Sequence, residues 1–228
     1  MADYNGTDED DIIDASELDS DIGNIYPGKG DDTVTNATSS HTIVSGPGED
    51  NISGEKFGYA LWNATQAVTI NLKENWSEDG FGTRDTISGV ETIHGSSFGD
   101  TIYGSENYER YFVNGGNNTI DGGGGYDRAS YAPGRGASTD FEITYIDGSA
   151  HVKGQNTLDI LTNISTIEFM DDSKIFSVDD ENGSIFNGAI FYGTENYESF
   201  FIDGGNNIVY AGGGDDLVYY KNGNSKDY

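Results

Sequence analysis

Acidic residues recur in this chain directly after glycine-rich turns. Residues 27–35 read PGKGDDTVT, 45–53 read SGPGEDNIS, 122–130 read GGGGYDRAS and 211–219 read AGGGDDLVY. In each stretch an Asp stands at the sixth position and an apolar or small residue at the eighth. A turn that aims several backbone carbonyl groups at one point needs dihedrals that glycine adopts at low cost, and the carboxylate adds charge. Carbonyl and carboxylate oxygens together are the ligands that calcium prefers.

These acidic turns repeat with a period of nine residues. From Pro27 onward the register places Val34, Ile43 and Ile52 at position eight, and residues 6–14 join it after a slip of three residues. A nonapeptide that is half turn and half short strand predicts a parallel β-roll, an all-β fold in which two repeats complete one coil. Because side chains alternate along a strand, position eight should face the core. The predicted core residues are Val34, Ile43, Ile52, Ile102, Ile120, Phe191, Phe200, Val209 and Val218.

Turns on the same side of such a roll are eighteen residues apart, so two of them can hold one ion between them. This spacing pairs Asp32 with Asp50, Asp100 with Asn118, Glu109 with Asp127, and Glu198 with Asp216. The glycines of these turns complete the predicted metal sites: Gly28, Gly30, Gly46, Gly48, Gly123, Gly125, Gly212 and Gly214. Ala189 has no oxygen ligand on its side chain, which predicts a weak or empty turn there. His41 stands at position six without a same-side carboxylate, and we interpret it as a surface histidine.

The repeats form three blocks, at residues 6–56, 95–130 and 184–220. Residues 104–131 and 193–220 are identical at 15 of 28 positions, so the third block is a copy of the second. The stretches between them, 57–94 and 131–183, lose the period but alternate apolar and polar residues, which predicts inserted antiparallel strands. One hairpin is expected around Asp147-Gly148, and residues 221–228 form a tail.

The composition restricts the possible partners. The chain has 228 residues, of which 34% are hydrophobic, and its formal net charge is −29. Such charge repels phosphate groups, which excludes nucleic acid as a partner, and it favours cations. There is no cysteine, so disulfides and thiolate metal sites are excluded. No apolar run is long enough for a membrane span, and the first residues show no cleavable signal peptide.

The motif resembles that of the RTX, or haemolysin-type, calcium-binding repeat family, G-G-x-G-x-D-x-U-x with U apolar. The resemblance covers a little under half of the chain. It implies a right-handed parallel β-roll with several calcium ions between adjacent turns. It also implies an extracellular protein that folds after type I export from a Gram-negative bacterium. Departures such as Pro27 at the first glycine, and Glu109 and Glu198 in place of Asp, bear on the affinity of single sites.

Two functions follow from this sequence, neither of them catalytic. No metalloprotease, nucleophile-elbow, P-loop or dinucleotide motif is present, and Asp171 and Asp172 are neighbours that a strand would point to opposite faces. The first function is a calcium module that folds on binding calcium and stabilises or spaces its parent protein. The alternative is a module for polysaccharide or a cell surface, such as the repeat module of an alginate epimerase. It rests on aromatic residues that can stack on sugars, in ENYERYF, ENYESFF, Trp62 and Trp76. An acidic polysaccharide would require Arg84, Arg110, Arg128 and Arg135 to cluster, or calcium to bridge.

Overall fold

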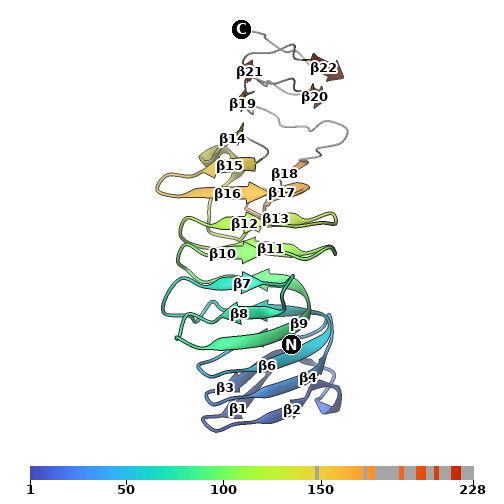
Figure 1. Cartoon of the computed structure of the whole chain (residues 1–228), viewed down its shortest axis with the longest axis vertical. Coiled ribbons are helices and arrows are strands. Elements are labelled where there is room, and N and C mark those ends of the chain that lie inside the picture. The colour runs from blue at the N-terminus through green and yellow to red at the C-terminus, as the bar shows by residue number, and fades with distance from the viewer. Residues whose placement is uncertain are drawn as a thin grey trace.

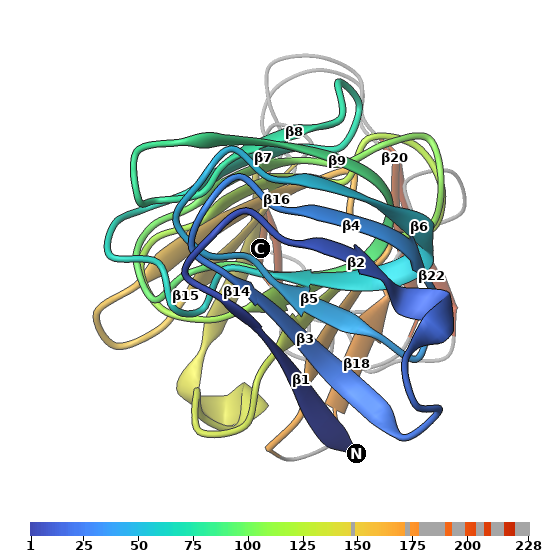
Figure 2. The same ribbon diagram turned by 90° about the horizontal axis from the view of Figure 1, so that it is seen from below.

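The computed structural model describes residues 1–146 and 149–171, together with the backbone of five strands between residues 174 and 221. Its strands stack one above another into an elongated roll, with the N-terminus near one end (Figure 1). Seen along the axis, the strands superimpose in two layers joined by turns (Figure 2). The only helices among the described residues are two single 3-10 turns, Ala15–Glu17 and Ser138–Asp140. The prediction of an all-β parallel roll is confirmed.

One layer, here called face A, consists of parallel strands extended by a hairpin. Its strands in the N-terminal half are β2 (Ile12–Asp14), β4 (Thr33–Ala37), and the first halves of β6 (Asn51–Ala60) and β9 (Arg84–His94). The antiparallel strands β8 (Trp76–Glu78) and β7 (Thr69–Asn71) follow, and β7 then pairs in parallel with β10 (Thr101–Tyr103). Beyond β10 lie β12 (Thr119–Asp121), β16 (Leu158–Thr162), β15 (Ser149–Lys153) and β14 (Glu142–Ile146).

The opposite layer, face B, begins with β1 (Ala2–Thr7), β3 (Ile22–Gly28) and β5 (Thr42–Val44). It continues through the second halves of β6 and β9 to β11 (Arg110–Val113), β13 (Arg128–Tyr131), β17 (Thr166–Phe169) and β18 (Lys174–Ser177). Strands β6 and β9 therefore belong to both faces. They bend where Lys56 and Gly89 have positive φ angles, of 60° and 84°.

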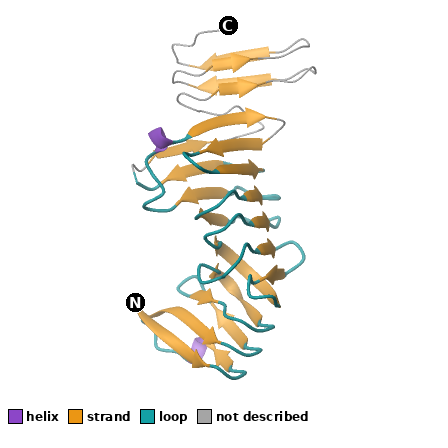
Figure 3. Cartoon of the chain, turned by 90° about the vertical axis from the view of Figure 1, so that its left-hand side faces the viewer, coloured by secondary structure: helices purple, strands orange, loops and turns teal. Residues whose placement is uncertain are grey.

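The inserted stretches continue the roll. The β7–β8 hairpin of the 57–94 stretch fills face A between β9 and β10 (Figure 1). Figure 3 shows from the side that strands are stacked along the whole described part of the chain, with loops between them. In the 131–183 stretch, β14 and β15 form the expected hairpin, with Ile146 opposite Ser149. Strands β19 (Ile190–Tyr192) and β21 (Ile208–Tyr210) extend the sheet from β14, and β20 (Ser199–Asp203) pairs in parallel with β22 (Leu217–Lys221).

The register reproduces the predicted coil. Thr33 lies beside Asn51, Thr101 beside Thr119, and Arg110 beside Arg128, each pair eighteen residues apart. The first coil is three residues longer, because Ile12 lies beside Thr33.

Position eight lies in the core wherever side chains are described: Val34, Ile43, Ile52, Ile102 and Ile120 are all buried, as predicted. The side chains of Phe191, Phe200, Val209 and Val218 lie outside the described residues. Towards the C-terminal end of the described roll the core becomes aromatic, with Tyr131 stacked on Phe169 at a ring distance of 4.8 Å.

Glycine is required where consecutive turns touch. A Cβ added to Gly46 would lie 1.8 Å from the carbonyl oxygen of Gly28 in the coil before it. At Gly124 the nearest atom to an added Cβ would be the flexible end of the Glu106 side chain, at 2.6 Å, and the backbone Cα of Glu106 would be in ordinary contact at 3.4 Å.

We therefore expect Gly46→Ala to lower the free energy of unfolding by about 1 to 3 kcal/mol, the usual cost of overpacking. Gly124→Ala should be close to neutral, because the Glu106 side chain can move aside. Urea unfolding in calcium, followed by circular dichroism, measures both. Equal stability of the two variants would show that the turns do not stack as described.

Candidate functional site

The structure brings together the members of each predicted pair that it describes. In every pair the side-chain oxygen of the later residue accepts the backbone N–H of the earlier one. The N···O distances are 3.0 Å for Asp32 and Asp50, 3.0 Å for Asp100 and Asn118, and 2.7 Å for Glu109 and Asp127. The fourth pair, Glu198 and Asp216, lies outside the described residues, as do Gly212 and Gly214.

These contacts extend beyond pairs into ladders along the edges of the roll. On one edge Asp11 donates its N–H to Asp32, and Asp50 donates its N–H to Asp85, so that four aspartates follow one another. Further along, Val68 donates its N–H to Asp100, and Asn118 donates its N–H to Asp159. Within these ladders, each of the named acidic or amide side chains after Asp11 accepts a backbone N–H from the turn before it.

The ladder side chains are almost completely buried. Asp32, Asp50, Asp100, Glu109, Asn118 and Asp127 are each at most 3% exposed. Burial disfavours the charged carboxylate, and nearby carboxylates add repulsion. Burial is the largest cause that raises the pKa of Asp32 to about 6 and that of Asp127 to about 7. Burial also raises the pKa of Asp50, Asp100 and Glu109. A cation beside these groups would remove this cost.

The predicted glycines shape the turns. Gly28, Gly30, Gly48, Gly123 and Gly125 have φ angles between +82° and +148°, which other residues rarely adopt. Gly46 has no such angle and is needed for close stacking, as described above. The stacked turns place backbone carbonyl oxygens of one coil against the glycines of the next. A Cβ added to Gly48 would lie 1.8 Å from the carbonyl oxygen of Gly30, and one added to Gly125 would lie 2.2 Å from that of Asn107.

The residue at the second position of the turn decides whether the acid at position six has a hydrogen-bond donor within its own turn. Where it carries Ser or Thr, the hydroxyl donates a hydrogen bond to the acid at position six. Thr7 donates in this way to Asp11 at 2.9 Å, Ser96 to Asp100 at 2.5 Å, and Ser105 to Glu109. The substitutions of glycine at this position therefore give the acid a partner within its own turn.

Where the second position is glycine, two carboxylates lack such a partner. Gly28 precedes Asp32 and Gly123 precedes Asp127, and the Oδ2 atom of each aspartate is buried without a hydrogen bond. A buried carboxylate oxygen without a donor is costly, and a hard cation such as calcium satisfies it. Both atoms fit a calcium site that also uses turn carbonyls. Among the described residues no three His, Cys, Asp or Glu side chains gather as a metal site, so carbonyl oxygens must supply the other ligands.

Asp50 differs, because its turn begins with Ser45. The Ser45 hydroxyl contacts Asp50 Oδ2 at 2.5 Å and Asp85 Oδ2 at 3.0 Å, and the Tyr59 hydroxyl donates to Asp85 at 2.5 Å. Asp85 was missed as a ladder residue, because it follows Asp50 after 35 residues instead of a multiple of nine. The signal was present in residues 80–88, GFGTRDTIS, with Asp at position six and Ile at position eight.

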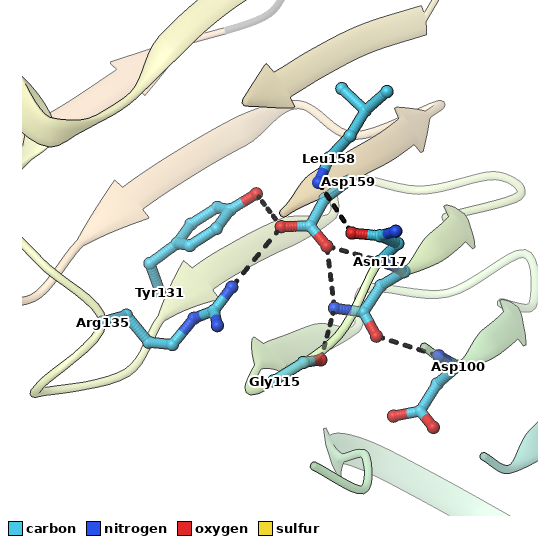
Figure 4. A network of polar contacts seen from close by, with 8 residues as sticks. Asp100, Gly115, Asn117, Tyr131, Arg135, Leu158 and Asp159 are labelled. Atoms are coloured by element: carbon cyan, nitrogen blue, oxygen red, sulfur yellow. Dashed lines mark hydrogen bonds and ion pairs between the residues drawn. The ribbon is translucent and has the colours of Figure 1, made fainter. Parts of the chain in front are cut away.

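Asp159 was missed for the same reason, although residues 154–162, GQNTLDILT, carry the pattern. Its carboxylate accepts both the backbone N–H and the side-chain amide of Asn118, each at 2.8 Å, and the Tyr131 hydroxyl at 3.0 Å (Figure 4). The Arg135 guanidinium lies 3.7 Å from the same carboxylate. A cation of the chain itself, Arg135, therefore lies at the end of the ladder that runs through Asp100, Asn118 and Asp159.

Two further residues from the sequence analysis, His41 and Asp171, accept hydrogen bonds from backbone N–H groups. His41 accepts the backbone N–H of Thr38 at 3.0 Å through Nδ1. Asp171 accepts the backbone N–H groups of Gly134 and Gly136 at 3.0 and 2.9 Å, and Asp172 lies outside the described residues.

The four arginines do not form one cluster. Arg110 and Arg128 both approach Glu168, at 2.7 and 3.8 Å, Arg135 faces Asp159, and Arg84 lies over the ring of Trp76. A basic patch for an acidic polysaccharide is therefore not formed by these residues.

Comparison with known families identifies the repeat in three parts of the chain. The family model described as the RTX calcium-binding nonapeptide repeat matches four copies, within residues 85–107, 112–129 and 203–226. The first match begins at Asp85, and the coils of residues 6–56 fold in the same way without being matched. Comparison with curated proteins returns no match. None of the described helices has the length and apolar character that a membrane span requires.

Proposed function

The chain carries RTX calcium-binding nonapeptide repeats, and from this premise we propose that it is a non-catalytic module that folds when calcium binds its turns. The proposal rests above all on the buried Oδ2 atoms of Asp32 and Asp127, which lack a hydrogen-bond partner. With a net charge of −29, repulsion opposes the compact apo state, and bound cations relieve it.

The proposed sites are the two turn pairs that contain these atoms. One ion would lie between the turns of Asp32 and Asp50, and another between the turns of Glu109 and Asp127. Asp100 already accepts hydrogen bonds from Ser96 and Val68, so we rank its turn below these two. By sequence, Gly212 takes the place of Gly123 in the turn of Asp216, which adds that turn to the proposed sites.

Such a module would form part of a secreted bacterial protein. Calcium-dependent folding keeps the chain unfolded where calcium is scarce and folds it outside the cell, where modules with sub-millimolar to millimolar affinity are saturated. Export by a type I system and a role in stabilising or spacing a parent protein complete the proposal.

A calcium titration tests this function. Starting from chelated protein, far-UV circular dichroism and calorimetry should show β-structure and compaction with calcium, with at least two ions bound per chain. Magnesium should not substitute, because it keeps a rigid octahedral water shell. Equal folding with and without calcium would overturn the proposal.

Part of the evidence for the alternative, polysaccharide binding, does not hold, because two of the aromatic residues behind it pack against other side chains of the protein. In ENYERYF, Tyr111 is fully buried in the core, and Phe112 stacks on His94 at a ring distance of 4.2 Å beneath Arg110. These rings are engaged within the protein. Trp76 lies on the outer surface of face A, in a row with Asn71, Tyr103 and Asp121.

A further inference from the structure

The outer surface of face A carries a row of side chains suited to ligand contact. Strands β8, β7, β10 and β12 are adjacent in this order (Figure 1). Their pairing places Trp76 beside Asn71, Asn71 beside Tyr103, and Tyr103 beside Asp121. Their neighbours Ile70, Ile102 and Ile120 are buried, so the row faces outward. Since neighbouring strands are about 4.8 Å apart, the two aromatic residues are separated by roughly 10 Å.

A groove is centred on this row beside Tyr103. Asn71, Lys73, Tyr103, Glu106 and Asp121 line it, with the backbone of the turns at 104–105 and 123. Tyr103 is 44% exposed although it lies in the middle of a sheet. Among the described residues its hydroxyl makes no hydrogen bond and Lys73 forms no ion pair, so both are free to contact a ligand.

Some polar atoms of the groove form hydrogen bonds within the protein, and others have no partner in the described part of the chain and can contact a ligand. Asp121 accepts the N–H of Gly123 and the side-chain amide of Asn163 through Oδ1, at 3.0 and 2.7 Å. Both bonds fix the carboxylate and leave its Oδ2 to a ligand. Asn71 accepts the N–H of Glu74 with its side-chain oxygen at 2.9 Å, which leaves the amide N–H groups as donors.

The charges of the groove favour a neutral ligand. Lys73, Glu106 and Asp121 line the same groove, so a polyanion would be repelled by two carboxylates and a cation by one ammonium group. An exposed aromatic ring among a few donors and acceptors fits a ligand with an apolar ring face and hydroxyl groups at its edge. A pyranose sugar has this form.

We propose that the groove binds a neutral saccharide, with one pyranose ring over Tyr103 and its hydroxyl groups on Asn71, Lys73 and Asp121. Trp76 flanks the site at about the span of a disaccharide. The Arg84 guanidinium covers one face of the Trp76 ring, 3.7 Å from the ring centroid. It makes no ion pair among the described residues, so its N–H groups can contact the hydroxyl groups of a more distant sugar.

The test uses the full chain in saturating calcium. Calorimetry is carried out with neutral hexasaccharides of β-1,4-linked glucose, mannose and galactose, and with oligogalacturonate as the acidic probe. We expect at least one neutral probe to bind and Tyr103→Ala to weaken it about tenfold or more. Tyr103→Phe should retain most of the binding, because the ring is kept.

Tyr126→Ala is the matched control, because Tyr126 is 56% exposed on a turn outside the groove and should not affect binding. Calcium-induced folding of each variant is checked by circular dichroism, which separates loss of the groove from failure of the calcium-dependent fold. The proposal is wrong if no neutral probe binds to folded protein, if only oligogalacturonate binds, or if Tyr103→Ala and Tyr126→Ala bind equally.

Discussion

Replacing Asp32 with Asn should have opposite effects with and without calcium. In calcium the variant should bind one ion fewer and need roughly tenfold more calcium to fold, because a charged ligand contributes about 1.5–3 kcal/mol. Without calcium it should fold at least as readily as the wild type, because the substitution removes a buried charge with an unpartnered Oδ2. The amide fits this position, since Asn118 fills the equivalent place and accepts the N–H of Asp100 at 3.0 Å.

Asp31→Asn is the matched control, one residue away in the same turn. Asp31 is exposed, and its carboxylate accepts the N–H of Glu49 at 2.9 Å. It should change neither the number of ions nor the calcium midpoint by more than about twofold, as expected for a screened surface charge. Calorimetry gives the number of ions, and folding induced by trimethylamine N-oxide compares the variants without calcium. If Asp32→Asn is destabilising in both conditions, the carboxylate has a structural role and no metal role.

Acidification should stabilise the calcium-free roll and destabilise the calcium-bound one. Burial raises the pKa of Asp32 to about 6 and the pKa values of Asp85 and Asp127 to about 7, whereas unfolded aspartate titrates near about 3.9. The folded apo state thus binds protons more tightly than the unfolded state does. The stability that these three groups contribute is fully present below about pH 4 and is lost as the pH rises to about 7.

Bound calcium reverses the dependence of stability on pH, because protons compete with the ion for the same carboxylate oxygens. The calcium-bound protein is unfolded with urea at pH 5, 6 and 7.5, and the calcium-free protein is folded with trimethylamine N-oxide at the same pH values. The stability of the calcium-free protein should fall with pH, and that of the calcium-bound protein should rise. Asp127→Asn should flatten both curves, since it removes one of the groups that titrate. Parallel pH profiles with and without calcium would contradict the assignment of these carboxylates to metal sites.

The repeat made much of the fold predictable. Position eight identified the core residues Val34, Ile43 and Ile52 because a strand buries alternate side chains. The nine-residue period predicted the contacts between Asp32 and Asp50 and between Glu109 and Asp127, because a solenoid repeats the same neighbours every coil. The three-residue slip of the first coil was visible in the sequence as well.

The stretches without a clear period required the structure. The long strands β6 and β9 bend around an edge of the roll, and the β7–β8 hairpin fills the sheet between them and β10. As a result Asp85 and Asp159 enter the ladders at separations of 35 and 41 residues. A loop can close over many lengths at little difference in free energy, so the period does not determine where it returns.

By itself, the sequence determined the coil, its inward-facing residues and the turns that carry acidic side chains, because these depend on neighbours at fixed short spacing. Only the tertiary structure decided which carboxylates have partners. Ser45 and Tyr59 satisfy Asp85, Arg135 faces Asp159, and Asp32 and Asp127 each keep one buried oxygen without a donor. Those partners come from distant segments, and the burial that makes an unpartnered oxygen costly exists only once the coils have stacked.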